Sequence, residues 1–210
     1  MGVISPVGND VNTFWSNLCN GVCGIDHIKS FPTDNLPVGI AGIIKDFKAE
    51  EYGMDKPFIR KQDLFTQYGV AAAYQAMRQS GLSSKGEDKN IDPFRLGVYF
   101  GSGIGGFATQ YREISKMIED PSGQWISPLF IPTMISNIAA GHIAILNNAQ
   151  GPCLDIVTAC ATSTNAMGEA FRAIRNGYAD AIITGGCENA TIPIGIVGFA
   201  NAKALSRATD

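Results

Sequence analysis

The residues from Cys153 to Arg172 contain the strongest candidate for chemistry in this chain, because they combine a cysteine with a change of local structure. A short apolar stretch typical of a β-strand ends near Thr158, and a helical pattern with apolar residues three and four positions apart follows it. Cys160 is therefore expected at a strand-to-helix junction. Its sulfur would lie near the free N–H groups and the positive end of the helix, which favour the thiolate and hence a nucleophile.

Position alone leaves a second interpretation of Cys160 open. Most free cysteines are small, buried, apolar residues, and a cysteine nucleophile normally needs a histidine as its base or partner. The chain has two histidines: His27 in a glycine-flanked loop and His142 in an apolar helix, where a structural histidine is the better interpretation. A hydrolase or an acyl-transfer step without condensation would require His142 near Cys160.

The segment Gly101–Gly106 matches G-x-G-x-x-G between a predicted strand and a predicted helix, which is the context of a dinucleotide site. Such a site also needs an acidic residue about twenty positions further on, at the end of a strand. Glu119 and Asp120 lie near that distance, but they end a helix and precede Pro121. We therefore expect the glycines to let the backbone pass close to a neighbouring element or a ligand chain.

The periodicity of apolar residues predicts the elements that position these segments. A helix over residues 10–19 starts at Asn9 or Asp10, and a longer helix over residues 63–80 stops at Gly81. Residues 45–60 are charged and irregular. The remaining predicted elements are strands over 38–44, 94–100, 153–157 and 179–185 and helices over 107–118, 135–146 and 192–205. This alternation indicates an α/β fold, a single domain over residues 1–210 with a mixed, mostly parallel sheet covered by helices on both faces.

The composition excludes several classes of protein. A net charge of −3 gives no electrostatic reason to expect nucleic acid as a partner. Five cysteines form no paired framework and indicate a reducing compartment, and Cys19 and Cys23 are the only close pair, so no metal is expected. The N-terminus has no basic and apolar regions of a signal peptide, and apolar runs such as Ile192–Ala200 are too short to span a membrane. We expect a cytoplasmic protein.

The sequence Val-Thr-Ala-Cys-Ala-Thr-Ser at residues 157–163 resembles the active-site signature of β-ketoacyl-[acyl-carrier-protein] synthases. The similarity is greatest to the chain-elongating type II synthases and the related polyketide ketosynthases, which have the thiolase-like fold. Further matches occur in the family's order: Gly2–Gly8, Gly101–Gly106, Ile131-Pro132, Gly141-His142, Gly185-Gly186, Gly198-Phe199 and Ala204–Ser206. They cover essentially the whole chain, which is identified by this resemblance as a member of the family.

The resemblance implies an acyltransferase of fatty-acid or polyketide synthesis. Cys160 matches the nucleophile that accepts an acyl chain from a carrier-protein thioester, and its backbone N–H matches an oxyanion donor. In the complete enzyme, the enolate of malonyl-carrier protein would attack the acyl group on Cys160 in a decarboxylative Claisen condensation. The resemblance implies no cofactor.

The same resemblance assigns substrate and partner residues. Ile104 and Phe199 match residues that line the acyl pocket, and Phe130 and Ile131 match the segment that reaches the partner's pocket in a homodimer. The positions that match basic residues for an acidic acyl carrier protein are Arg60, Lys61 and Lys203.

The chain also departs from the family pattern. The family chain is about twice as long, and its second half supplies two catalytic histidines, a lysine and a phenylalanine-containing loop, while a valine-rich strand precedes the position of Gly2. We therefore expect a thiolase-like half-fold that lacks the first strand and the C-terminal half, and an isolated chain without condensing activity. Asn165 stands where many members have histidine, which need not abolish chemistry. The alternative is a non-catalytic half that associates with another ketosynthase chain.

Overall fold

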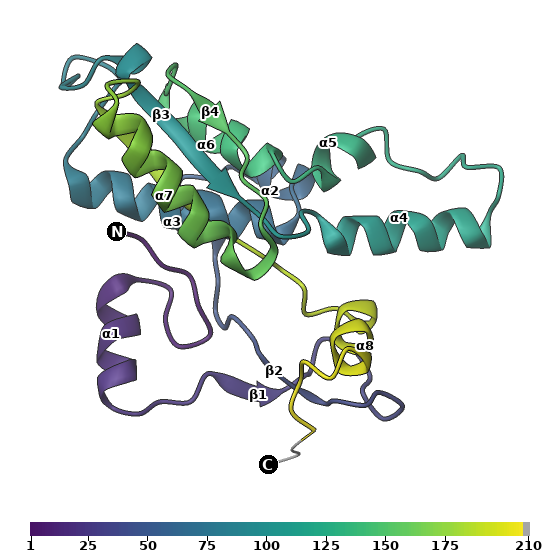
Figure 1. The fold of residues 1–210 in the computed structure, drawn as a ribbon. Helices are drawn as coiled ribbons and strands as arrows, with labels where there is room; N and C mark the ends of the chain where they lie inside the picture. Colours follow the sequence, from purple (N-terminus) through teal and green to yellow (C-terminus); the bar gives the residue numbers. More distant parts are fainter. Residues whose placement is uncertain (208–210) are drawn as a thin grey trace. The chain divides into compact units, whose positions relative to one another are not determined.

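The computed structural model describes residues 1–207, and these form two compact units (Figure 1). The first unit comprises Met1–Gly2 and Ala49–Glu188 and contains the parallel sheet with its helices. The second unit comprises Val3–Lys48 and the residues from Asn189 onward. Each unit is described by itself.

The sheet of the first unit has three parallel strands: β3 (Leu96–Gly101), β4 (Cys153–Leu154) and β5 (Ala181–Gly186). Their order in space is β4-β3-β5, so β3 lies in the middle. Every residue of β3 is buried, as expected for a central strand with helices on both faces. At the carboxyl ends of the strands, Gly101 lies opposite Gly186. The predicted α/β architecture with a parallel sheet is confirmed.

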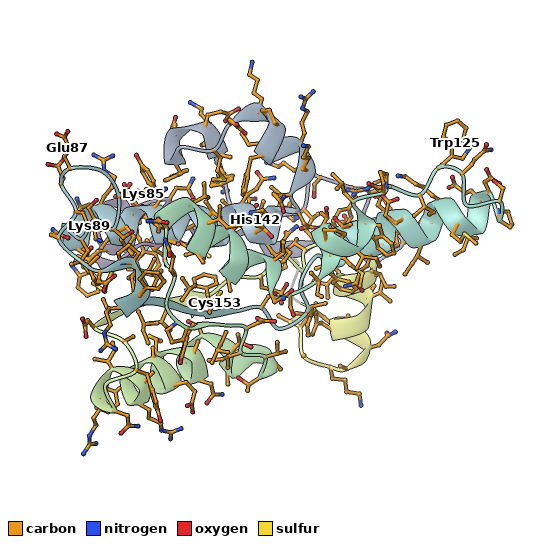
Figure 2. All side chains as sticks on the ribbon, turned by 90° about the horizontal axis from the view of Figure 1, so that it is seen from above. Lys85, Glu87, Lys89, Trp125, His142 and Cys153 are labelled. Atoms are coloured by element: carbon orange, nitrogen blue, oxygen red, sulfur yellow. The ribbon has the colours of Figure 1, made fainter. Side chains whose placement is uncertain are left out.

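Helices cover both faces of this sheet (Figures 1 and 2). The helices α3 (Leu64–Ser80) and α6 (Ile138–Asn147) pack together on one face, and α7 (Thr162–Arg175) packs on the other. The side of α7 that faces the sheet carries small buried residues: Ala166, Ala170 and Ala173. Their spacing of three and four residues is the helical periodicity seen in the sequence.

The predicted start and stop of α3 are confirmed. Asp63 caps its N-terminus by accepting the Phe65 N–H, and Gly81 ends the helix with a φ of 68° in the left-handed region. The other oxygen of Asp63 accepts both the N–H and the hydroxyl of Thr109, at 2.9 and 2.7 Å. One buried carboxylate therefore fixes α3 to the first turn of α4 (Phe107–Glu119).

The prediction that residues 45–60 are irregular was wrong. They contain the 3₁₀ helix η1 (Ala49–Tyr52), and α2 (Lys56–Lys61) begins there. The helix α2 starts with Asp55 accepting the Phe58 N–H, and a proline occupies its first turn, where no N–H is needed. Two further short helices join the longer elements: η2 (Pro93–Arg95) and α5 (Phe130–Met134).

The second unit contains the predicted N-terminal helix and a short antiparallel ribbon. The helix is α1 (Val11–Cys19), whose cap Asp10 accepts the N–H groups of Asn12 and Thr13. The ribbon pairs β1 (Ile25–His27) with β2 (Ile40–Gly42), and α8 (Pro193–Asn201) follows later in the chain. A small apolar cluster joins the ribbon segment to α8: Ile28, Val38, Ile196 and Ala200. Across the described residues 1–207, no helix is long and apolar enough to cross a membrane.

Candidate active site

Three segments meet where the parallel strands of the first unit end. Because β3, β4 and β5 run in the same direction, the loop Gly101–Gly106, the stretch Asp155–Cys160 and the pair Cys187-Glu188 all follow the carboxyl edge of the sheet. This edge is where open α/β sheets bind ligands. The candidate nucleophile and the glycine-rich loop are therefore on the same edge.

Cys160 lies at the predicted strand-to-helix junction. It is exposed and occupies the 3₁₀ turn η3 (Ala159–Ala161), which leads directly into α7. Ala159 has a φ of 50°, a left-handed conformation that residues with a side chain adopt uncommonly. Backbone strain of this kind concentrates at functional sites. The junction is confirmed, and the role of Cys160 as a nucleophile stays a prediction.

Two side-chain hydrogen bonds fix the turn to the first turns of α7. The Thr158 N–H donates to the hydroxyl of the buried Thr162 at 2.9 Å, and the Asn165 amide donates to the Thr158 hydroxyl at 2.7 Å. Asn165, one of the departures from the family pattern, therefore holds the strand end against the helix that follows Cys160.

N–H groups beside the thiol are available to an anion. The Cys160 N–H has no acceptor among the described residues, and Ala161, at the N-cap of α7, offers no side-chain acceptor to the first turn. Free N–H groups and the helix dipole make such a terminus positive. The geometry therefore suits a thiolate or a developing oxyanion at Cys160.

The glycines of the Gly101–Gly106 loop allow close backbone approach, as the sequence predicts. A Cβ atom on Gly101 would lie 1.9 Å from the carbonyl oxygen of Ile156 and 2.7 Å from Cγ2 of Thr162, which no side chain can tolerate. At the other end of the loop, the Gly106 N–H donates to the Met134 carbonyl at 2.9 Å. The loop therefore packs by its backbone between the elbow and the end of α5.

The other thiols of the first unit are poor candidates for a nucleophile. Cys153 is exposed as a residue, but partial burial of its thiol raises its pKa, and the Asp155 carboxylate adds to this effect. Burial raises the pKa of Cys187 still further, with Glu188 and Asp155 contributing. Both thiols are therefore held in the protonated form, which is unreactive toward a carbonyl carbon.

His142 lies on α6, on the face of the sheet opposite α7 (Figure 2). Its ring packs edge-on against Phe58, with the ring centroids 4.9 Å apart, and burial lowers the pKa of its imidazole. This is the environment of a structural histidine, so the interpretation in which His142 serves as the base for Cys160 gains no support. Across residues 1–207, no three histidine, cysteine, aspartate or glutamate side chains gather in a way that could hold a metal ion.

The structure brings part of the predicted substrate and carrier residues together. Ile104 belongs to the loop beside the elbow. Phe130 and Ile131 begin α5, and Arg60 and Lys61 form the last, exposed turn of α2. The Thr133 hydroxyl on α5 donates to the Lys61 carbonyl at 3.0 Å, which fixes the end of α2 to α5.

Two predicted site residues belong to the second unit. Phe199 lies on α8 and borders an apolar pocket of about 300 Å³ within that unit, together with residues of the β1–β2 ribbon. Lys203 is exposed just after α8 and has a φ of 57°.

Sequence reasoning missed one residue of the site. The Glu188 carboxylate accepts the N–H of Ile104 at 2.9 Å and the hydroxyl of Ser102 at 3.2 Å. These partners lie 84 and 86 positions away in the chain, so no local pattern predicts them. The available signal was the position of Glu188 two residues after a strand that ends in two glycines.

Comparison with known proteins identifies one family over the whole chain. The family described as "Beta-ketoacyl synthase, N-terminal domain" matches residues 1–210. Over all 210 residues, the chain is 42% identical to 3-oxoacyl-[acyl-carrier-protein] synthase 2 of Staphylococcus aureus (strain N315), of which it covers 49%. It is 43% identical over the same length to the protein of that name from Vibrio cholerae serotype O1 (strain ATCC 39315 / El Tor Inaba N16961), again covering 49%. The chain spans about half the length of the curated relatives it matches.

Solved structures share the fold. The ishigamide ketosynthase/chain length factor superimposes with a TM-score of 0.83 at 23% identity, over 98% of this chain and 50% of that one. AntDE:AntF, a type II PKS acyl-carrier protein in complex with its ketosynthase bound to the hexaketide, gives a TM-score of 0.76 at 25% identity, over 94% and 52%. The expected thiolase-like α/β fold is thereby confirmed. Because the domain family matches residues 1–210, and relatives named 3-oxoacyl-[acyl-carrier-protein] synthase 2 match over the same span, the chain belongs to the β-ketoacyl synthase family.

Proposed function

We propose that Cys160 accepts an acyl chain from an acyl-carrier-protein thioester, as the loading step of a β-ketoacyl synthase in fatty-acid or polyketide synthesis. The observation that carries this proposal is the geometry of the elbow. An exposed thiol occupies a strained turn, beside an N–H without an acceptor and before a helix end that has no side-chain cap. The relatives named as 3-oxoacyl-[acyl-carrier-protein] synthases support the assignment of the carrier.

The loading step is a transfer between two sulfur atoms. The Cys160 thiolate attacks the thioester carbonyl carbon, and the new C–S bond forms while charge moves onto the carbonyl oxygen. The Cys160 N–H donates to that oxyanion. The bond to the carrier's sulfur then breaks, and the departing thiolate takes up, through water, the proton that the Cys160 thiol had released. The acyl group remains on Cys160.

The proposal extends to the residues around the elbow. Ile104 and Phe199 line the acyl pocket, and Phe130 and Ile131 reach toward the pocket of a second copy. Three basic residues contact the acidic carrier protein: Arg60, Lys61 and Lys203. The support for Arg60 and Lys61 is their exposure on a helix end that is fixed to α5.

We propose that these 210 residues do not complete the condensation by themselves. The histidine of the first unit, His142, packs against Phe58 on the far face of the sheet from α7. Incubation of the purified protein with acyl- and malonyl-carrier protein should therefore give no elongated product. Elongation above the background without protein would contradict this proposal.

Acyl loading is tested by intact-mass analysis after incubation with an acyl-carrier-protein thioester. The wild-type chain should gain one acyl group, and peptide mapping should place it on Cys160. The exposed Cys19, Cys23 and Cys153 are internal controls for non-selective acylation. Cys160→Ala should abolish the adduct, whereas Cys153→Ala should retain it. An adduct that persists in Cys160→Ala, or a folded wild-type protein that forms none, would refute the loading proposal.

A second candidate function is association with another ketosynthase chain as a non-catalytic half. The observation that favours it is an apolar surface on α4 and the segment after it, where α4 projects beyond the sheet (Figure 1). Its large exposed side chains are Tyr111, Ile114, Met117, Ile118, Trp125, Leu129 and Ile131. An accumulation of exposed apolar side chains along a helix and the segment after it is typical of interaction sites, and one structural neighbour is a ketosynthase/chain length factor.

Sedimentation over a range of protein concentrations tests this association. Ile118→Asp should weaken it, because Ile118 is the most exposed of the apolar side chains named for the α4 surface. Ile145→Asp is the matched control, since Ile145 is exposed to a similar degree, 72% against 76%, but lies on α6. Equal effects of the two substitutions would exclude the α4 surface. Association together with an unreactive Cys160 would favour the non-catalytic half over the loading enzyme.

A further inference from the structure

Glu188 lies at the junction between the sheet and the glycine-rich loop. The backbone of β5 continues one residue past its last strand position, because the Cys187 N–H donates to the Gly101 carbonyl at 3.1 Å. Glu188 follows at once, so its side chain starts beside the first residues of the loop. The loading step as proposed gives this side chain no part.

One oxygen of Glu188 holds two parts of the loop. Its Oε2 accepts the Ile104 N–H at 2.9 Å and the Ser102 hydroxyl at 3.2 Å. The buried Ser102 hydroxyl in turn accepts the Gly105 N–H at 2.9 Å. A single carboxylate therefore satisfies one backbone donor directly and fixes the hydroxyl that satisfies a second one.

The loop residue between these bonds packs against the elbow. A Cβ atom on Gly103 would lie 3.2 Å from Glu188 Oε2 and 3.4 Å from the carbonyl oxygen of Ala159. Gly103 therefore packs against both Glu188 and Ala159, the strained residue directly before Cys160. A movement of the Glu188 carboxylate would be transmitted to the position of the loop relative to the thiol.

We propose that Glu188 is a positioning residue that holds Ile104 at the acyl pocket beside Cys160 and thereby sets how well long acyl chains are accepted. This inference rests on the proposed loading function. Glu188 acts through the loop backbone and through Ser102, and it does not touch the reacting atoms. The effect depends on hydrogen-bond acceptance, so a glutamine at this position should serve nearly as well as the glutamate.

The acyl readout compares wild type, Glu188→Ala and Glu188→Gln by the initial rate of adduct formation on Cys160. Acetyl and dodecanoyl carrier-protein thioesters serve as substrates, and iodoacetamide reports thiol reactivity without a pocket. Glu188→Ala should lower the rate of dodecanoyl loading about tenfold more than the rate of acetyl loading, because a tenfold effect corresponds to one lost hydrogen bond. The rate of alkylation of Cys160 by iodoacetamide should change less than twofold. Glu188→Gln should recover most of the loss. Glu87→Ala, in the loop before β3 at the opposite end of the sheet (Figure 2), is the matched surface control.

A second readout is independent of acyl chemistry. Hydrogen exchange should show faster exchange of the Ile104 and Gly105 amides in Glu188→Ala and slower, near-normal exchange in Glu188→Gln. If Glu188→Ala does not fold, Ser102→Ala replaces it and should accelerate exchange at Gly105.

The outcomes separate the two proposals. A wild-type protein that forms no adduct with either thioester refutes the loading function, while the exchange data still decide whether Glu188 holds the loop. Equal losses with both thioesters and with iodoacetamide, unchanged exchange at Ile104, or a Glu188→Gln protein as impaired as Glu188→Ala would each overturn the positioning role.

Discussion

The buried carboxylate of Glu113 gives the sharpest stability prediction. Its side chain on α4 is only 1% exposed and accepts the Ser127 N–H at 2.9 Å, the Lys116 ammonium at 2.9 and 3.0 Å and the Arg112 guanidinium at 2.9 Å. Burial opposes ionisation, but the Ser127 amide, Lys116 and Arg112 outweigh it and lower the pKa of Glu113 to about 2. The carboxylate thus fixes the segment after α4 back onto the helix.

The magnitude follows from the difference between the folded and unfolded pKa of Glu113. A fall from the ordinary value of 4.5 to about 2 corresponds to roughly 3 kcal/mol at 1.36 kcal/mol per pH unit. Water screens both cationic partners, because the side chains of Lys116 and Arg112 are 35% and 56% exposed, so about 2 kcal/mol is the better expectation. Since the folded pKa is the lower one, this stabilisation is complete above about pH 4.5 and is lost as the pH falls toward 2.

Urea unfolding followed by circular dichroism measures this contribution. Glu113→Gln should lower the free energy of unfolding by about 2 kcal/mol at neutral pH, and the difference from wild type should shrink toward zero near pH 2. Glu119→Gln, at the exposed end of the same helix, is the control and should change little. A Glu113→Gln protein as stable as wild type at neutral pH would refute the argument. A difference that grows as the pH falls would refute it as well.

Two further predictions concern the loop and the carrier protein. Gly101→Ala should destabilise the protein by about 3 kcal/mol or more in thermal denaturation, because the added Cβ would overlap the Ile156 carbonyl just before the elbow. The control is Gly141→Ala on α6, where a Cβ meets no atom within 4 Å. This substitution should be neutral or stabilising by about 0.5–1 kcal/mol. Arg60→Glu combined with Lys61→Glu should slow loading from the acidic carrier about tenfold, and the effect should shrink at high salt. The control Lys89→Glu, at an exposed lysine, should leave the loading rate unchanged. If the double variant loads as fast as wild type at every salt concentration, Arg60 and Lys61 do not belong to the carrier surface.

Elements with strong local signals were predictable. The caps Asp10 and Asp63 and the stop at Gly81 are set by residues adjacent to each helix, so α1 and α3 agree with the sequence within one residue. Helix α2 was missed although Asp55 and Pro57 signal its start, because a six-residue helix has too few turns to show a periodicity.

Tertiary contacts decided the remaining differences. The strand predicted over residues 153–157 pairs only as Cys153–Leu154, and Asp155 instead accepts the Ser136 hydroxyl at 2.5 Å. Burial raises the pKa of Asp155, with the Ser136 bond acting in the opposite direction. The elbow at Cys160 could be placed from sequence. The Glu188 carboxylate that holds the loop beside it could not, because that contact exists only when β5 lies next to β3 in the sheet.

The absence of a side chain on Gly101 has a consequence for evolution and for engineering. The loop that carries Ile104 and the segment that leads to Cys160 pack backbone against backbone, with Gly101 directly against Ile156. There is no compressible side chain between them that could absorb a displacement. If Cys160 loads acyl chains as proposed, a change of chain-length preference made through the loop backbone would also move the thiol. Substitutions of the Ile104 side chain leave this backbone packing intact, so under the same proposal they would change specificity while reactivity is retained.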